Sequence, residues 1–127
     1  MLNKDKVKLA IAPIAWTNDD LPDLGAENTF EQCISEMALA GFTGSEIGNK
    51  YPSDAKELKR ELDLRGMRIA SRWFSSFILT QPLETVEADF VRELEFLSAV
   101  GANRINVCIV AIHQKRHTVH GTDLRTH

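Results

Sequence analysis

The side chains best suited to chemistry lie in short polar segments, each placed directly after an apolar run. The first segment carries Trp16, Asn18, Asp19 and Asp20 behind the apolar residues 7–14. An aromatic wall beside amide and carboxylate groups suits a hydroxyl-rich ligand such as a polyol. The same residues also fit a partly buried tryptophan followed by a turn in which an Asn or Asp side chain bonds to its own backbone. Both interpretations stay open at this point.

Glu46 and Lys50 are the candidates for acid–base chemistry. Glu46 lies in the apolar run 42–47, where a carboxylate is costly unless it is paired or used. Lys50 follows in the next loop beside Asn49, and its ammonium can pair with Glu46 or hold a substrate oxygen. A structural Glu46–Lys50 ion pair and a functional pair fit this spacing equally well.

A third polar segment contains Arg72 and Trp73, which the alternation of a strand directs to opposite faces. One of the two therefore points toward the ligand side of the sheet, although aromatic packing is the alternative for Trp73. The histidines at positions 113, 117 and 120 have spacings like those of metal ligands but form no HExxH motif. We interpret residues 113–127 as a solvated polar tail or an unfinished loop, and we expect no metal site in this chain.

Four apolar, β-rich runs alternate with three segments of helical periodicity. The predicted strands span 7–14, 42–47, 67–74 and 104–112, and the predicted helices span 29–40, 52–65 and 83–100. Thr29 and Gln32 predict a capping box at the start of the first helix. A glycine follows each helix, as expected of a helix stop, at positions 41, 66 and 101.

This βαβαβαβ order favours parallel strands joined by right-handed crossovers. Two α/β architectures fit it: a small doubly wound sheet and part of a (β/α)₈ TIM barrel. The chain has 127 residues, whereas a complete barrel takes about 250. A flavodoxin-like domain would add a fifth strand and a closing helix. We therefore predict the N-terminal half of a (β/α)₈ barrel, with strands 1–4 and three helices, over residues 1–127.

Composition excludes several classes of function. A net charge of −3 gives no electrostatic basis for binding nucleic acid or an anionic membrane, and no apolar stretch approaches the ~20 residues of a membrane span. The patterns GxGxxG, GxxxxGK[ST], GxSxG and CxxC do not occur. Cys33 and Cys108 lie in apolar runs, which is typical of buried thiols in a reducing compartment. We expect a cytoplasmic protein whose partner is a small molecule.

Four segments together resemble one known family. They read IAPIAWTNDDLPDLG (11–25), AGFTGSEIGNKYP (40–52), LDLRGMRIASRWFSS (62–76) and LSAVGANRINVC (97–108). In this order they resemble the inosose dehydratases, which belong with the xylose-isomerase-like TIM barrels. The resemblance covers residues 7–108. It implies a carbon–oxygen lyase of myo-inositol catabolism that removes water from the cyclic polyol ketone 2-keto-myo-inositol, using manganese or cobalt, with glutathione associated with the activity.

The resemblance also implies site residues, all of which lie in the strand-end motifs: Trp16, Asn18, Glu46, Asn49, Lys50 and Trp73. The tryptophans would form apolar walls of the substrate pocket, and the asparagines and Lys50 would bind ring hydroxyls. Glu46 would orient these groups or assist proton transfer. We therefore predict Glu46 and Lys50 as the catalytic pair.

The chain departs from the family in two respects. The family's metal ligands come from later strands, and Ile109 stands where the family usually has a glutamate at the end of the fourth strand. We therefore expect the isolated chain to be inactive and to bind no catalytic metal. The alternatives are a sugar isomerase or epimerase of the same superfamily, and a non-catalytic remnant of a truncated or frameshifted reading frame. Such a remnant could pair with a second copy through its open sheet edges.

Overall fold

The computed structural model describes residue 3 and residues 5–111 of the chain. The elements are β1 (Ala10–Ile11), the 3₁₀ turn η1 (Pro13–Ala15), α1 (Phe30–Leu39), β2 (Gly44–Ile47), α2 (Ala55–Asp63), β3 (Arg68–Ser76), α3 (Leu83–Ala99) and β4 (Asn106–Ile109). The predicted alternation of strands and helices is confirmed. The predicted tail at residues 113–127, with its three histidines, lies outside the described residues.

The first strand is shorter than its apolar run predicts. Only Ala10 and Ile11 pair with the next strand, opposite Gly44 and Ser45, and the chain then turns into η1. Pro13 stands at the start of that turn, where its missing N–H cannot contribute to a strand ladder. The apolar run 7–14 therefore predicts a longer strand than forms, and much of it is exposed: Val7, Leu9 and Ile14 are 38%, 58% and 67% exposed.

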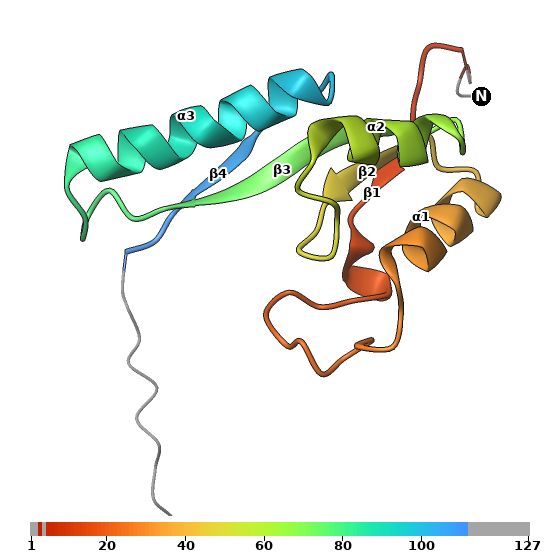
Figure 1. The fold of residues 1–127 in the computed structure, drawn as a ribbon, viewed down its shortest axis with the longest axis horizontal. Helices are drawn as coiled ribbons and strands as arrows, with labels where there is room; N and C mark the ends of the chain where they lie inside the picture. Colours follow the sequence, from red (N-terminus) through yellow and green to blue (C-terminus); the bar gives the residue numbers. More distant parts are fainter. Residues whose placement is uncertain (1–2, 4, 112–127) are drawn as a thin grey trace, which may run out of the picture.

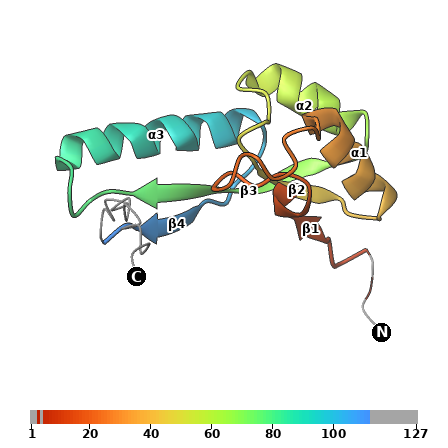
Figure 2. The same ribbon diagram turned by 90° about the horizontal axis from the view of Figure 1, so that it is seen from below.

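The sheet is parallel and its strands follow the chain order, β1-β2-β3-β4. Helices α1, α2 and α3 all lie on one side of it, as Figure 1 and Figure 2 show. A doubly wound sheet would reverse its strand order and carry helices on both faces. The sequential order with one covered face is instead the arrangement of a curled half of a (β/α)₈ barrel. We call the face opposite the helices the inner face.

The core lies between the sheet and the helices, mainly α1 and α2. Ile34, Met37 and Leu58 are fully buried, and Phe30 meets Tyr51 edge to face with ring centres 4.8 Å apart. Leu62 of α2 is buried as well. These side chains hold the sheet in the curvature that positions the inner face.

The helix ends follow local sequence signals. The side chain of Thr29 accepts the Gln32 amide at 3.2 Å, but the amide of the Gln32 side chain donates to Glu36, so only half of the predicted capping box forms. Asp54 caps α2, slightly later than the predicted start at Pro52. The glycines after the helices, at positions 41, 66 and 101, have φ angles of 93°, 65° and 81°, as helix stops in the left-handed region do.

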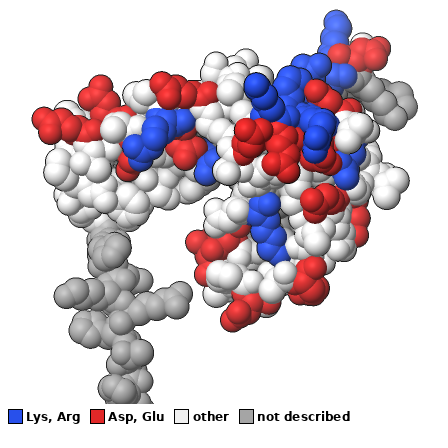
Figure 3. All heavy atoms as spheres, viewed as in Figure 1, with Lys and Arg blue, Asp and Glu red and all other residues white. Residues whose placement is uncertain are grey.

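Charged side chains of both signs lie next to one another on the surface around α2 (Figure 3). Lys59 pairs with Asp63 at 2.9 Å, and Arg65 pairs with Glu61 at 3.1 Å. Opposite charges at this spacing largely cancel one another's field. Within the described ranges, no helix combines the length and the apolar character needed to cross a membrane.

Candidate functional site

A cavity of about 390 Å³ opens at the carboxyl ends of the strands. In (β/α)₈ barrels this end carries the ligand-binding and catalytic groups. The cavity is formed by the segment after β1 and by the ends of β2 and β3. Its lining residues are Ala12, Pro13, Ile14, Thr17, Asn18, Asp19, Asp20, Glu46, Ile47, Trp73 and Ser75.

A polar cluster spans three neighbouring strands on the inner face. Glu46 of β2 accepts hydrogen bonds at Oε2 from Ser71 Oγ of β3 at 3.2 Å and from Asn106 Nδ2 of β4 at 3.0 Å. Asn106 Nδ2 also donates to Ser71 Oγ at 3.2 Å. The carboxylate of Glu46 thus accepts two hydrogen bonds at one oxygen, at the edge of the cavity.

An irregularity in β3 brings Ser71 to this position. Ser45 pairs with Ile69 but the next residue, Glu46, pairs with Ser71, so Ala70 is the extra residue. A bulge of this kind shifts the alternation of side chains along the strand by one. Without it, Ala70 would lie opposite Glu46 and the carboxylate would lose one hydrogen-bond donor.

The alternation predicted for Arg72 and Trp73 is confirmed. Arg72 turns to the helix side, where its Nε lies 2.9 Å from Glu93 of α3 and its guanidinium covers the ring of Phe96. Trp73 lies on the opposite face, lines the cavity and is 56% exposed. Its indole N–H donates to Ser75 Oγ at 3.2 Å. Trp73 is therefore the residue of the pair that faces the candidate site.

Lys50 is engaged elsewhere. Its Nζ donates to the backbone carbonyls of Gly25, Ala26 and Asn28 at 2.9, 3.1 and 2.6 Å. An ammonium group has three N–H donors, so these bonds use all of them. Among the described residues, Lys50 forms no ion pair with Glu46. The contacts fasten the loop after β1 to the loop after β2, and a direct part for Lys50 in proton transfer stays a prediction.

Trp16 also turns away from the cavity. Its indole N–H donates to Glu36 Oε2 of α1 at 2.5 Å, and its ring packs against the core. This hydrogen bond, followed by the one from Gln32, lowers the pKa of Glu36. The position predicted for Trp16, as a wall of the substrate pocket, differs from the observed one because α1 offers a hydrogen-bond acceptor on the helix side.

The two predicted asparagines have different positions. Asn18 lines the cavity, and its Oδ1 accepts the backbone amides of Asp20 at 2.9 Å and Leu21 at 3.0 Å. The turn inferred for this segment is therefore present, and Asn18 also contributes to the lining of the cavity. Asn49 is exposed and does not line the cavity; its backbone amide donates to the carboxylate of Asp19 at 3.2 Å. That bond links the same two loops that Lys50 links.

Ser71 and Asn106 are two members of the site that the sequence pattern did not indicate. Each is a polar residue in a predicted strand, as Glu46 is, and that shared feature was the available signal. Alternation counted along a regular strand would however place Ser71 on the same face as Trp73 without showing what lies opposite it. Only the strand pairing brings the three side chains together.

On the helix side of the sheet the buried polar groups are part of the core. Ser45 and the hydroxyl of Tyr51 form a hydrogen bond of 2.5 Å, and burial raises the pKa of Tyr51 to about 12. Cys33 is buried, as predicted, and burial raises the pKa of its thiol, whereas Cys108 is half-buried. Ser45, Tyr51 and Cys33 are separated from the cavity by the sheet, whereas Cys108 pairs with the cavity-lining Ser75 and lies on the inner face.

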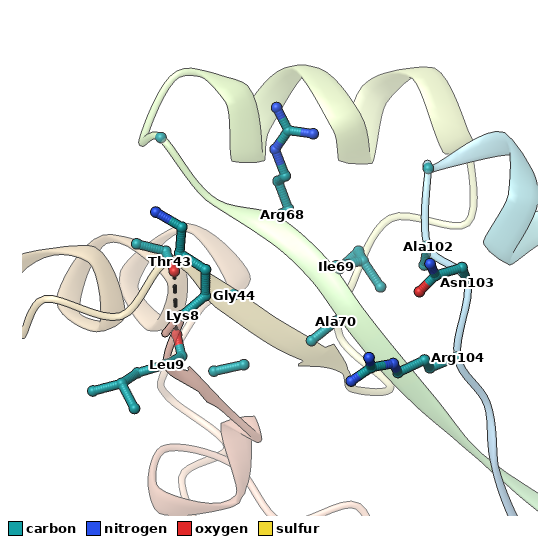
Figure 4. A pocket seen from close by; sticks show the side chains of 13 residues that line it. Lys8, Leu9, Thr43, Gly44, Arg68, Ile69, Ala70, Ala102, Asn103 and Arg104 are labelled. Carbon is teal, nitrogen blue, oxygen red and sulfur yellow. Dashed lines mark hydrogen bonds between the residues drawn. The ribbon is translucent and has the colours of Figure 1, made fainter. Parts of the chain in front are cut away.

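A larger cavity of about 640 Å³ lies at the opposite end, at the amino ends of the strands. Its lining includes Lys8, Arg68 and Arg104, which Figure 4 shows pointing in different directions rather than toward a common centre. In barrels this end contributes to stability rather than to chemistry. We therefore assign the functional site to the smaller cavity at the carboxyl ends.

The described part of the chain contains no group of three or more His, Cys, Asp or Glu side chains that could hold a metal ion. Asp19, Asp20 and Glu46 line one cavity, but they do not converge as such a group. The residues that the structure describes therefore do not fit a catalytic metal.

Proteins named inosose dehydratase align with nearly the whole chain. The one from Clostridium tetani (strain Massachusetts / E88) is 57% identical over 121 residues, which are 95% of this chain and 39% of the relative. The one from Clostridium perfringens (strain ATCC 13124) is 59% identical over 115 residues, 91% of this chain and 37% of the relative. The one from Bacillus thuringiensis (strain Al Hakam) is 53% identical over 121 residues, again 95% and 39%.

The chain is similar in sequence to proteins named inosose dehydratase. It spans about two fifths of the length of the curated relatives it matches. No family model matches the chain. The resemblance predicted from the strand-end motifs is confirmed. Since the similarity to inosose dehydratases extends over 95% of the chain, it includes most of the residues that line the cavity.

Proposed function

We propose that this chain forms part of the substrate-binding end of an inosose dehydratase, a lyase that removes water from 2-keto-myo-inositol in myo-inositol catabolism. The observation that carries the proposal is the 57% identity to a protein of that name over 95% of the chain. The cavity at the carboxyl ends supports it, because its aromatic, amide and carboxylate lining suits a cyclic polyol.

The elimination requires a base that takes the proton next to the ketone and an acid that assists loss of the hydroxyl group. Among the predicted site residues, Glu46 is the group we propose for proton transfer, since its carboxylate lies at the cavity and is held by two neighbours. We propose that Trp73 covers the apolar face of the ring and that Asn18 contacts its hydroxyls.

We propose an indirect part for the remaining predicted residues, Trp16, Asn49 and Lys50. Each of them holds a loop or helix next to the cavity: Trp16 contacts α1, and the other two connect the loops after β1 and β2. In this arrangement they shape the cavity without contacting the ligand.

We propose that turnover in the parent enzyme uses manganese or cobalt and is associated with glutathione, as the resemblance implies. A bound divalent metal would stabilise negative charge on the ketone oxygen. We assign none of the described residues to it, because they do not fit such a site. We also propose a cytoplasmic location, which the two unpaired cysteines support.

The proposed function is tested by mixing the 127-residue chain with 2-keto-myo-inositol, with and without manganese or cobalt. We expect the chain to bind the ketone in a calorimetric titration but to form no conjugated, absorbing product. Clear turnover would contradict the inactivity of the isolated chain. Conversion of the ketone without absorbance would indicate the isomerase or epimerase alternative, and a lack of binding would contradict the proposed site.

We further propose that the chain associates with a second copy through its open edge. Val107 and Ile109 of β4, the edge strand among the described elements, are 52% and 60% exposed. Exposed apolar strand edges favour pairing between chains. Sedimentation velocity at increasing concentration should show a dimer, and a monomer at all concentrations would contradict this pairing.

A further inference from the structure

The Glu46–Ser71–Asn106 cluster has no free donor. Asn106 Nδ2 has two hydrogens, and it directs one to Glu46 Oε2 and one to Ser71 Oγ. The single hydroxyl hydrogen of Ser71 goes to the same Glu46 oxygen. Every polar hydrogen of the cluster is therefore engaged inside the cluster itself.

The atoms that remain are acceptors. Within the part of the chain that the structure describes, no hydrogen bond is made by Glu46 Oε1 or by Asn106 Oδ1. Asn106 is exposed on the inner face, and Glu46 lines the cavity. A ligand that reaches the cluster thus meets oxygen lone pairs and no N–H or O–H group.

The carboxylate determines the orientation of the Asn106 amide. An ionised carboxylate can only accept hydrogen bonds, so the amide must turn its Nδ2 toward Glu46 and its Oδ1 away. Rotating the amide by half a turn would place two acceptors 3.0 Å apart. The acceptor character of the free side of the cluster therefore follows from the three residue types and their spacing.

We propose that this cluster is a hydroxyl-reading subsite. It binds a polyol through hydroxyl donors, and it excludes ligand groups that carry only acceptors, such as a ketone, carboxylate or phosphate oxygen. The choice of a cyclic keto-polyol as ligand rests on the proposed function. For that ligand, the cluster turns the hydroxyl-bearing side of the ring toward β2, β3 and β4 and its ketone oxygen elsewhere in the cavity. Ser71 is a positioning residue, which acts by holding Glu46, whereas Asn106 both holds Glu46 and offers its Oδ1 to the ligand.

The test is ligand binding by the full chain, followed in amide proton–nitrogen correlation spectra with three probes: myo-inositol, sorbitol and sulfate. We expect the wild type to bind at least one of the two polyols and not sulfate. Asn106→Asp keeps the shape of the side chain but removes both donors and places a second carboxylate against Glu46. We expect it to weaken polyol binding about tenfold or more.

Asn103→Asp is the matched control, because it makes the same change of charge at an exposed position in the loop before β4, beside the opposite cavity. We expect it to leave polyol binding unchanged. Ser71→Ala should weaken binding several-fold and Ser71→Thr, which keeps the hydroxyl group, should restore it. Thermal melts of all four variants show whether each remains folded. If Asn106→Asp does not fold, the comparison of Ser71→Ala with Ser71→Thr tests the subsite.

Sulfate binding as tight as polyol binding, equal effects of the two Asn→Asp changes, or a failure of Ser71→Thr to restore binding would overturn the subsite. So would a wild type that binds neither polyol. Cluster-dependent binding of sorbitol without binding of myo-inositol would support the hydroxyl-reading subsite and contradict the inosose dehydratase assignment, so the two proposals fail in distinguishable ways.

Discussion

The two halves of the sheet, β1–β2 and β3–β4, differ in how tightly the helices pack against them. Helices α1 and α2 bury side chains completely, among them Ile34, Met37 and Leu58. Helix α3 is the longest helix described, with 17 residues, yet it buries only Val86 and Leu97. The part of the molecule around β1 and β2 is thus a packed core, whereas α3 and β4 are attached to it mainly through β3. Length and helical periodicity alone therefore do not measure how much a helix stabilises this fold.

The largest predicted effect separates these two regions directly. Leu58→Ala in α2 should lower the free energy of unfolding by about 2–5 kcal/mol, because a fully buried leucine leaves a cavity. Leu94→Ala in α3 makes the same chemical change at a side chain that is 41% exposed, and it should cost less than about 1 kcal/mol. Urea denaturation of both variants measures the difference. Equal losses would show that the α3 region is packed as tightly as the α2 region.

A smaller effect is expected from the loops of the packed region. Lys50→Met keeps the length of the side chain but removes its three bonds to the loop after β1. We expect a loss on the order of 1 kcal/mol and faster proteolysis within residues 18–28. Lys56→Met, on an exposed position of α2, is the control. Unchanged proteolysis would mean that Lys50 does not hold this loop.

The packed region also predicts a dependence of stability on alkaline pH. The pKa of Tyr51 is raised to about 12 by burial, above the ordinary value of about 10 for an unfolded chain. A raised pKa in the folded state gives a contribution that is complete below about pH 10 and is lost as pH rises toward 12. Tyr51 is the chain's single tyrosine, so phenolate absorbance reports it alone. A midpoint near 10 in the folded protein would contradict its burial.

The smallest predicted effect concerns the contact between Trp16 and α1. The Trp16 indole lowers the pKa of Glu36, so the contact contributes above the ordinary carboxyl range and is lost as pH falls through the lowered pKa. Trp16→Phe keeps an aromatic ring but removes the donor. In carbon NMR titrations the Glu36 midpoint should move upward in this variant. A midpoint that does not move would show that the indole is not the dominant partner of Glu36.

Local sequence signals predicted the helices and strands well because helix ends and side-chain alternation depend on neighbouring residues. The cap at Thr29, the glycine stops at 41 and 66, and the alternation of Arg72 and Trp73 each depend on neighbouring residues. Long-range contacts account for the differences. Lys50 donates hydrogen bonds to three carbonyl groups that lie more than twenty positions away in the sequence. The local spacing indicated Glu46 as the nearest partner of Lys50, so this contact between loops could not be predicted.

The sequence by itself thus determined the alternation of strands and helices, the similarity to inosose dehydratases and the set of polar residues at the strand ends. The tertiary structure decided which of them meet. The bulge at Ala70 and the order of the strands bring Glu46, Ser71 and Asn106 within hydrogen-bond distance, although they lie up to 60 positions apart. The physical reason is that helix caps and alternation are set by the local backbone, whereas a site shared by three strands depends on the register in which they pair.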